Sequence, residues 1–498
     1  MLERDSLRDG RPVYRQIADH FLAEIGCGRL VTGARLPAIR DLARSRDLAR
    51  SLEVNRDTVA LAYDALANAG AVESTVGRGT FVRGSAIAPG AAADLGPPDL
   101  SPMTENLLEL ERARPRFGSA VDAIPMHSLV PDPALYPADS FRKVLSRVLQ
   151  EVGPELLLYG GPQGFPRLRE VLAERLREVE IDVGAEDIVL CHGASQGIHL
   201  ATRLFAEAGD TVAIEEPTYN NVLAVMRGLG LKTLPVPMRD DGLDLDALEH
   251  ALARPEVKLL YAIPTFHNPT GITTALAHRH RLLEIVARHR KPVLEDAYEM
   301  DLRISGRAVP SLAALDTAGL VVHLFSFSKS LFPGARVGAI SARGRIVDAL
   351  VAQKQATDLS DSMLLQAALA EFVADGSYDR HLRKLRRVLR ERRDALLSAL
   401  EREMPGGVRW TRPDGGYQVW VELPEGLDTG ELLADAVGVG VLFAPGFQFN
   451  HDGRASNRLR LTYAMADSEP LRRGVEALAR LVRERLERGP RRLARVHI

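Results

Sequence analysis

A lysine flanked by serines at the end of an apolar run is well suited to covalent chemistry. The run 320–325 is apolar and β-branched, which predicts a buried strand of a parallel sheet, and Lys329 follows it closely. Loss of hydration lowers the pKa of an ammonium group, which would make Lys329 a nucleophile able to form a Schiff base. Arg336, seven residues later, would supply a fixed cation for a phosphate group. On these residues alone, an exposed loop carrying a lysine and an arginine is an alternative.

Other polar residues follow further strand-like runs in the same part of the chain. Apolar runs alternate there with helical stretches, which predicts a mostly parallel α/β sheet. The turn 192–197 follows strand 188–191 and begins a helix, so its backbone N–H groups and one hydroxyl form a candidate anion site. Asp296 ends another such run, and Glu295 should point to the opposite face because side chains alternate along a strand.

The lysine segment and the motifs before it resemble those of a known family. Segment 326–336, with its Ser-x-Ser-Lys and its later arginine, resembles the cofactor-lysine segment of fold type I pyridoxal phosphate enzymes, the aminotransferase superfamily. The sequence Asn-Pro-Thr-Gly at 268–271 is a further mark of that family, and the motifs occur in the family's order over roughly residues 120–485. The resemblance implies a mostly parallel central sheet, a smaller α+β domain, and pyridoxal 5'-phosphate as the cofactor.

The resemblance also implies which residues contact the cofactor. Asp296 would face the ring nitrogen, because a protonated pyridine needs a buried anion to keep its charge. Tyr219 would stack on the ring, and Asn268 and Tyr298 would contact the phenolic oxygen. Tyr159 would reach the phosphate of a partner subunit in a homodimer, with a core tyrosine as the alternative. The implied cofactor-binding positions are Tyr159, Gly193, Ala194, Ser195, Gln196, Tyr219, Asn268, Asp296, Tyr298, Ser326, Ser328, Lys329 and Arg336, of which Lys329 is the catalytic residue.

An arginine late in the chain is implied to bind a substrate or effector. The family places an arginine for the substrate carboxylate in an Arg-Leu-x-aromatic strand, and Arg460 fits that frame. A planar guanidinium suits two-pronged binding of a carboxylate. Arg458, two residues earlier, is expected on the same side and is the second candidate. No metal site is expected from the spacing of His267, His278, His280 and His289.

The first 83 residues predict a small helical unit followed by a hairpin. Apolar residues at helical spacing predict a helix over about 13–25, and further helices begin near Leu36 and after Asn55. Residues 72–82 alternate as the strands of a short hairpin do. Three helices and a hairpin in so short a stretch favour a winged helix-turn-helix, with a helical dimerisation module as the alternative.

Four short motifs of this unit resemble those of GntR-type DNA-binding domains. They are Pro12-x-Tyr14-x-Gln16-Ile17, Leu36-Pro37-x-x-Arg40, Arg56-x-Thr58-Val59 and Gly77-x-Gly79-Thr80-Phe81-Val82. In such domains the start of the third helix faces base edges, while the wing and flanking arginines hold phosphates. The resemblance implies DNA contacts by Arg40, Arg56, Thr58 and Arg78.

A short repeat departs from the pattern of that family. Residues 40–45 and 46–51 share the sequence Arg-Asp-Leu-Ala-Arg-Ser, where the family has a single copy. Six extra residues turn a helix by about 600°, so the apolar positions of the two copies cannot share one stripe. We expect either one copy to form a loop or the helix-turn-helix geometry to change.

Composition limits the class of protein more than its function. The 498 residues are 46% hydrophobic and 26% charged with a net charge of −2, so any DNA-binding surface must be local. With only two cysteines, the chain is not expected to have a disulfide framework. It has no apolar run of membrane-spanning length, so no membrane span is expected. The cytoplasm is the expected location. The predicted divisions are a DNA-binding domain (1–83), a flexible linker (84–118), a cofactor domain (119–488, its smaller part about 119–150 and 365–488) and a tail (489–498).

The order of the two domains resembles the MocR subgroup of GntR regulators. The implied function is a transcriptional regulator that binds a DNA operator and senses pyridoxal phosphate, an amino acid or an amine by aldimine exchange at Lys329. An active aminotransferase, acting on an amino acid and a 2-oxo acid, is the alternative, with a vestigial or accessory N-terminal unit. The intact set of catalytic residues could perform transamination. Asn268 favours this alternative, because many such regulators have a different residue there, and so does the repeat 40–51.

Overall fold

The computed structural model describes residues 12–37, 56–75, 79–83, 98–113 and 123–488. The chain divides into two compact units, Met1–Asp99 and Leu100–Ile498, and each is described by itself. Within these segments, none of the helices combines the length and the apolar character that crossing a membrane requires.

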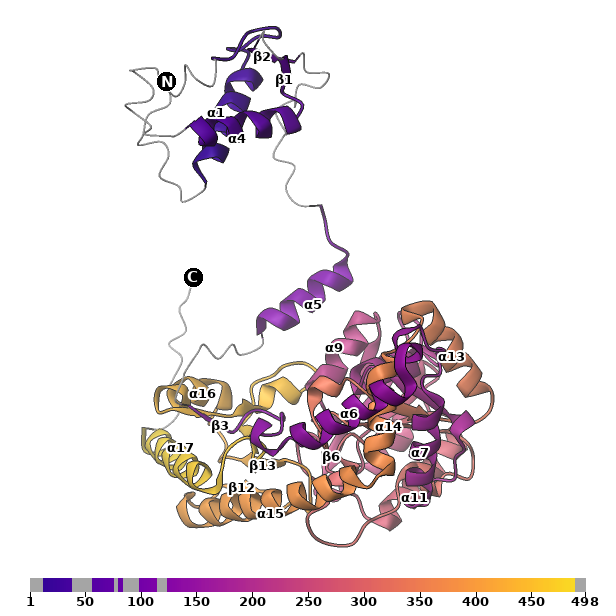
Figure 1. Cartoon of the computed structure of the whole chain (residues 1–498). Coiled ribbons are helices and arrows are strands. Elements are labelled where there is room, and N and C mark those ends of the chain that lie inside the picture. The colour runs from indigo at the N-terminus through magenta and orange to yellow at the C-terminus, as the bar shows by residue number, and fades with distance from the viewer. Residues whose placement is uncertain (1–11, 38–55, 76–78, 84–97, 114–122, 489–498) are drawn as a thin grey trace. The chain divides into compact units, whose positions relative to one another are not determined.

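The N-terminal unit packs helices against a hairpin (Figure 1). Its described elements are α1 (Val13–Gly26), α4 (Arg56–Asn68), β1 (Val72–Thr75) and β2 (Gly79–Val82). Ile17 of α1 and Val59 and Leu66 of α4 are buried in one cluster, because apolar residues spaced by three or four positions share a helix face. The antiparallel pairing of β1 with β2 confirms the predicted hairpin. The second predicted helix beyond Pro37, together with the repeat 40–51, lies outside the described residues.

A mostly parallel sheet forms the centre of the second unit. Its strands, in spatial order, are β4 (Ile188–Cys191), β11 (Gly338–Ser341), β10 (Val321–Ser326), β9 (Val293–Asp296), β8 (Val257–Ala262), β5 (Thr211–Glu216), β6 (Lys232–Arg239) and β7 (Gly242–Leu243). The five strands from β10 to β6 run parallel, whereas β11 and β7 run antiparallel to their neighbours. Strands β5, β8 and β10 are buried almost throughout, which their continuous apolar sequences allow. The predicted mostly parallel sheet is confirmed.

Helices cover both faces of this sheet (Figure 1). One face packs against α8 (Ala194–Arg203), α9 (Asn220–Gly228) and α13 (Arg345–Asp358). The other face packs against α7 (Pro166–Arg177), α10 (Leu245–Leu252), α11 (Leu276–His289), α12 (Leu312–Leu315) and α14 (Met363–Ala374). Val293 and Leu294 of β9 enter different clusters because side chains alternate along a strand. The same alternation separates Glu295 from Asp296.

The smaller part of this unit brings together segments from both ends. An antiparallel sheet contains β12 (Arg409–Trp410), β13 (Gln418–Glu422), β16 (Arg458–Thr462) and β15 (Ala444–Pro445). The early strand β3 (Ile124–Pro125) pairs in parallel with the late strand β14 (Val441–Leu442). The remaining helices are α5 (Pro102–Ala113), α6 (Ala138–Val152), α15 (Ser377–Glu403), α16 (Thr429–Gly438) and α17 (Ser468–Arg488).

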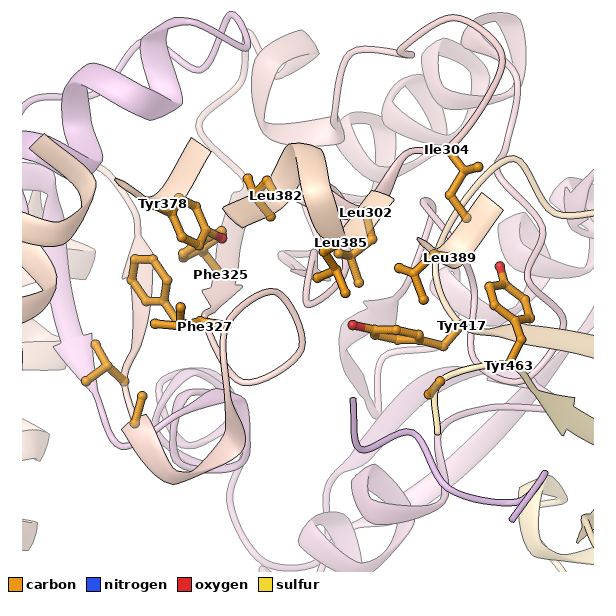
Figure 2. Packing of buried hydrophobic residues seen from close by; sticks show 14 of the residues in the cluster. Leu302, Ile304, Phe325, Phe327, Tyr378, Leu382, Leu385, Leu389, Tyr417 and Tyr463 are labelled. Carbon is orange, nitrogen blue, oxygen red and sulfur yellow. The ribbon is translucent and has the colours of Figure 1, made fainter. Parts of the chain in front are cut away.

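A large apolar cluster anchors the end of β10. The ring of Phe327 meets the ring of Phe325 edge-on at 4.9 Å between centroids and that of Tyr378 at 5.4 Å. Leucines of α15 extend the cluster toward Tyr417, as Figure 2 shows. Lys329 lies two residues beyond Phe327, so the segment that carries it starts from this packed cluster.

Candidate functional site

Lys329 lies beyond the end of β10 in a turn closed by hydrogen bonds. The hydroxyl of Ser326 accepts a hydrogen bond from the backbone N–H of Ser328 (3.2 Å). The Lys329 ammonium donates to the backbone carbonyl of Leu129 (3.1 Å), and the Tyr417 hydroxyl donates to the Lys329 carbonyl (2.7 Å). Burial lowers the pKa of the Lys329 ammonium below its usual value. The lysine is therefore both fixed in place and prepared to lose a proton.

Asp296 ends β9 next to a tyrosine of the neighbouring strand. The Tyr261 hydroxyl donates to Oδ2 of Asp296 (2.7 Å). The other oxygen, Oδ1, is buried and has no hydrogen-bond partner among the described residues. Burial raises the pKa of Asp296 to about 6, and the Tyr261 hydrogen bond acts in the opposite direction. Glu295 serves the other face, where it accepts hydrogen bonds from the backbone N–H groups of Leu312 and Ala313 in α12.

Positive charge from two sources meets at the turn between β4 and α8. Gly193 has a φ of +77°, which residues with a side chain rarely adopt, and α8 begins at the next residue. The first backbone N–H groups of α8 have no partner within the helix. The Arg336 guanidinium donates to the carbonyl of His192 (2.8 Å), and a Cβ on Gly193 would lie 3.3 Å from its Nη1. The turn therefore has the groups that bind a phosphate.

The two polar side chains of this turn are held by neighbouring residues. Asn221 of α9 donates to the hydroxyl of Ser195 (3.2 Å). The Gln196 amide accepts from the backbone N–H of His192 (2.7 Å) and donates to Asp358 (2.5 Å). The side chain of Gln196 thus shapes the turn, which leaves its backbone N–H as the group available to an anion.

Asn268, Tyr298 and Arg460 form a second polar cluster. Arg460 of β16 donates to Oδ1 of Asn268 (2.8 Å) and to the carbonyl of His127 (2.8 Å). Because the guanidinium occupies the amide oxygen, the N–H groups of Asn268 point elsewhere. The Tyr298 hydroxyl accepts a hydrogen bond from Nε2 of Gln418 (2.8 Å). Burial lowers the pKa of Arg460 to about 10, so its guanidinium stays charged at neutral pH.

Three further residues predicted from the sequence, Arg458, Tyr219 and Tyr159, each lie in a different environment. Arg458, the second candidate for a carboxylate, pairs with Glu422 (3.2 Å) at the exposed end of β16. Tyr219 directly precedes α9 and packs against the apolar cluster of that sheet face. Tyr159 is 87% exposed, which excludes the core tyrosine considered as its alternative.

The DNA-contact candidates are described in part. Arg56 begins α4, and Thr58 lies in the first turn of that helix. The N-terminal end of a recognition helix is where base edges are met. Arg40 and Arg78 lie outside the described residues.

Sequence reasoning did not single out Tyr261, Asn221 or Gln418. Tyr261 carried a signal, because a phenol inside an apolar strand needs a hydrogen-bond partner and β8 neighbours β9. Gln418 is 120 residues from Tyr298 in sequence, so no local pattern connects the two. Asn221 likewise meets Ser195 only through the packing of α9 beside α8.

Comparison with known proteins identifies both units. The family model of bacterial regulatory proteins, gntR family, matches residues 13–82, and that of aminotransferase class I and II matches residues 134–478. The probable rhizopine catabolism regulatory protein MocR of Rhizobium meliloti is 30% identical over 96% of this chain and 94% of its own length. The chain belongs to the MocR-type regulators.

Aminotransferases resemble the second unit of this MocR-type chain. Aromatic-amino-acid aminotransferase 1 of Thermococcus litoralis is 36% identical over 74% of this chain and 89% of its own length. The structure of LysN, the alpha-aminoadipate aminotransferase of Thermus thermophilus, superposes with a TM-score of 0.69 and 35% identity over 77% of this chain and 95% of its own. That structure is complexed with N-(5'-phosphopyridoxyl)-L-leucine.

Pyridoxal phosphate is the cofactor of this MocR-type protein, and the polar atoms of the site fit it. The buried, unpartnered Oδ1 of Asp296 suits a protonated ring nitrogen. Arg336 and the start of α8 suit a phosphate. The desolvated amine of Lys329 suits an aldehyde.

Proposed function

We propose that this chain is a pyridoxal-phosphate-dependent transcriptional regulator whose N-terminal unit binds an operator and whose second unit binds an amino acid or amine at Lys329. The observation that carries the proposal is the presence, in one chain, of a gntR-family unit and of a second unit with a buried lysine and an unpartnered Asp296 oxygen. The end-to-end match with MocR supports it, whereas the aromatic aminotransferase matches 74% of the chain.

Each side chain of the cofactor site has a proposed task. When bound, pyridoxal phosphate supplies an aldehyde that condenses with amines and a ring that draws electrons from them. Asp296 would keep the ring nitrogen protonated, and Tyr219 would fix the plane of the ring. Asn268 and Tyr298 would donate to the phenolic oxygen. The phosphate would be held by Gly193, Ala194, Ser195, Gln196, Ser326, Ser328 and Arg336.

Arg460 is the proposed carboxylate-binding residue. Its guanidinium is buried, lies 4.9 Å from the centre of the Phe449 ring, and keeps an Nε donor that has no partner within the described part of the chain. A buried donor without a partner costs free energy unless a ligand satisfies it. A ligand with both an amine and a carboxylate would therefore meet Lys329 and Arg460 together.

The DNA-binding side of the proposal involves a homodimer. Arg40, Arg56, Thr58 and Arg78 would contact the operator, and two such units would read its two halves. Tyr159, exposed on its own chain, would reach the phosphate of the partner subunit. This function places the protein in the cytoplasm, where the operator is. A ligand would alter DNA affinity by preferring one of two arrangements of the dimer.

DNA binding by the full-length protein tests the proposal. Fluorescence anisotropy would compare a duplex taken from upstream of the protein's own gene with a shuffled duplex, across a salt series. We expect tighter binding of the upstream duplex, weakening with salt, and a change in affinity when pyridoxal phosphate and then a panel of amino acids are added. Lys329→Ala is the control, and it should keep DNA binding and lose the response to amino acids. Equal affinity for both duplexes under every condition contradicts a regulator.

Active transamination is the second candidate function. The contact between Arg460 and Asn268 favours it, because the carboxylate-binding and ring-binding groups are already joined. Turnover of an amino acid with a 2-oxo acid at about one per second or faster, without specific DNA binding, would establish the enzyme. Turnover slower by several orders of magnitude would support the regulator and not the enzyme.

A further inference from the structure

A buried lysine holds two carboxylates close to the turn 192–197, called here the phosphate turn. Lys354, near the end of α13, donates to both oxygens of Asp358 (3.0 and 3.1 Å) and to Oδ1 of Asp361 (3.0 Å). Helix α13 packs against β4 and α8, the two elements that the phosphate turn joins. A fully buried ammonium is costly unless carboxylates pair with it, so Lys354 fixes the positions of both.

The first carboxylate reaches the backbone of the phosphate turn through a glutamine. Gln196 donates to Oδ2 of Asp358 (2.5 Å) and accepts from the backbone N–H of His192 (2.7 Å). A carboxylate only accepts and a backbone N–H only donates, so one orientation of the amide satisfies both partners. Asp358 therefore determines how the Gln196 side chain lies, and Gln196 in turn holds the N–H of His192.

The second carboxylate makes the same kind of connection to another segment. Gln366 of α14 donates to Oδ2 of Asp361 (3.0 Å) and accepts from the backbone N–H of Phe165 (2.7 Å), the residue before α7. Gln366 is 1% exposed, and Lys354 is fully buried. The phosphate turn is thus tied through Lys354 to the packed base of α14 and α7.

His192 is the residue at which this network meets the phosphate-binding groups. Its N–H is held by Gln196, and its ring Nε2 lies 3.0 Å from Oδ1 of Asp361. Its carbonyl accepts from the Arg336 guanidinium (2.8 Å), and Gly193, with its φ of +77°, follows directly. A shift of the His192 backbone would therefore move both Arg336 and the first N–H groups of α8.

Charge compensation alone does not explain why two carboxylates lie here. Asp361 already supplies one negative charge for the single positive charge of Lys354. A second carboxylate close to an anion site repels the anion, so Asp358 acts against phosphate binding unless it contributes something else. The contact that Asp358 makes and Asp361 does not is the hydrogen bond from Gln196.

We propose that Asp358 is a positioning residue for the phosphate turn. Through Gln196 it holds the backbone of His192, and with it Arg336, in the arrangement that binds the phosphate group of the cofactor. Asp358 acts through these residues and is not a catalytic residue. The inference rests on the proposed phosphate contacts of the turn, and it is independent of DNA binding.

A comparison of two aldehydes tests this inference, because pyridoxal lacks the phosphate group of pyridoxal phosphate. Full-length protein stripped of cofactor would be titrated with each aldehyde, and the visible absorbance would report binding at Lys329. Asp358→Ala removes the acceptor for Gln196 and should weaken pyridoxal phosphate binding by about 10-fold, the usual effect of losing one charged hydrogen bond. Pyridoxal binding should stay within about twofold of wild type, whereas general damage to the fold would weaken both.

A double-mutant cycle shows whether Asp358 acts through Gln196. Gln196→Ala leaves the charge unchanged and should also weaken pyridoxal phosphate binding by about 10-fold. Adding Asp358→Ala to it should change the affinity by less than about twofold, because the two residues act in one chain of contacts. A pure charge effect would persist in the double variant and would have the opposite sign, since loss of a carboxylate favours an anion.

Two further variants make the result decisive. Asp348→Ala, at an exposed position in the first turn of the same helix, is the matched control and should keep both wild-type affinities. Asp358→Asn covers the case in which the alanine variant does not fold, and it should give a smaller loss in the same direction.

Unchanged or tighter pyridoxal phosphate binding in the Asp358 variants, or equal weakening of both aldehydes, would overturn the inference while the proposed function stands. Wild-type protein whose absorbance responds to neither aldehyde would overturn the proposed cofactor lysine, and this inference with it.

Discussion

Two buried lysines of the second unit, Lys329 and Lys354, differ in how their charge is compensated. Lys354 of α13 is fully buried, and its Nζ lies 3.0 Å from a carboxylate oxygen of Asp358 and 3.0 Å from one of Asp361. Lys329 donates instead to a neutral group, the backbone carbonyl of Leu129 (3.1 Å). Two carboxylates therefore compensate the charge of Lys354, whereas Lys329 has a neutral carbonyl in that place.

The groups around the two lysines extend the contrast. Asp358 also accepts from Gln196, and Asp361 accepts from Gln366 and lies 3.0 Å from Nε2 of His192. Around Lys329, by contrast, buried oxygens of Asp296 and Glu299 have no hydrogen-bond partner among the described residues. Polar groups whose hydrogen bonds are complete build the scaffold, and those left incomplete mark where a ligand or a proton is exchanged. Four variants test that distinction.

Lys329→Ala should have the largest effect, because it removes the amine that the cofactor aldehyde requires. We expect complete loss of the visible absorbance of the purified protein, with the helical circular dichroism signal unchanged. Lys354→Ala in parallel should keep the absorbance of whatever fraction remains folded. An unchanged spectrum in the Lys329 variant would show that the cofactor is bound through another residue.

Lys354→Met should destabilise the second unit by about 3–5 kcal/mol, because it leaves two buried carboxylates without their cation. Urea unfolding followed by fluorescence would measure the change. Lys143→Met, at an exposed position of α6, is the matched control and should change stability by less than about 0.5 kcal/mol. Equal stability of the two variants would remove the distinction between the lysines.

Asp296→Asn should weaken pyridoxal phosphate binding by about 10- to 100-fold, the usual range for one charged hydrogen bond. Without cofactor the same variant should be more stable than wild type by up to about 3 kcal/mol. The sign follows from the pKa, which is about 6 in the folded chain against 3.8 for an ordinary aspartate. The cost of the carboxylate therefore appears as pH rises through this interval. A cofactor-free variant less stable than wild type at pH 7 would contradict it.

His192→Gln should have the smallest effect and should depend on pH. The hydrogen bond to Asp361 raises the pKa of His192 above its ordinary value of 6.5. Its stabilisation is therefore present below pH 6.5 and is lost as pH rises through the folded-state pKa. Melting curves of the two proteins should differ most in mild acid and converge in alkali. A difference that is constant across pH would exclude protonation as its cause.

Sequence reasoning succeeded where the residues that determine a structural feature are close together in the chain. Apolar runs predicted the parallel strands, and alternation along β9 predicted that Glu295 and Asp296 would face opposite ways. The hairpin of the N-terminal unit followed from the same rule. These features depend on neighbours in sequence, which is why they could be derived without coordinates.

Contacts across long sequence separations could not be derived in this way. Glu299 receives its environment from Gln418, 119 residues away, so nothing near it in sequence distinguishes it from a surface glutamate. Lys354 and Asp358 have the spacing of an ordinary exposed helix pair, and it is the packing of α13 against α8 and β4 that buries the lysine. Arg458 and Arg460 share a strand, but the first reaches its exposed end and the second reaches Asn268.

Tyr159 lies outward beside Leu157 and Leu158, which are 68% and 70% exposed. If a second copy of the chain covers this segment and Tyr159 has its proposed role, cofactor retention would depend on protein concentration, because a lone subunit would lack one of the proposed phosphate contacts. Dilution would then release the vitamin before it unfolds the polypeptide. The concentration of the protein would then determine what fraction of it keeps the cofactor and can respond to a ligand.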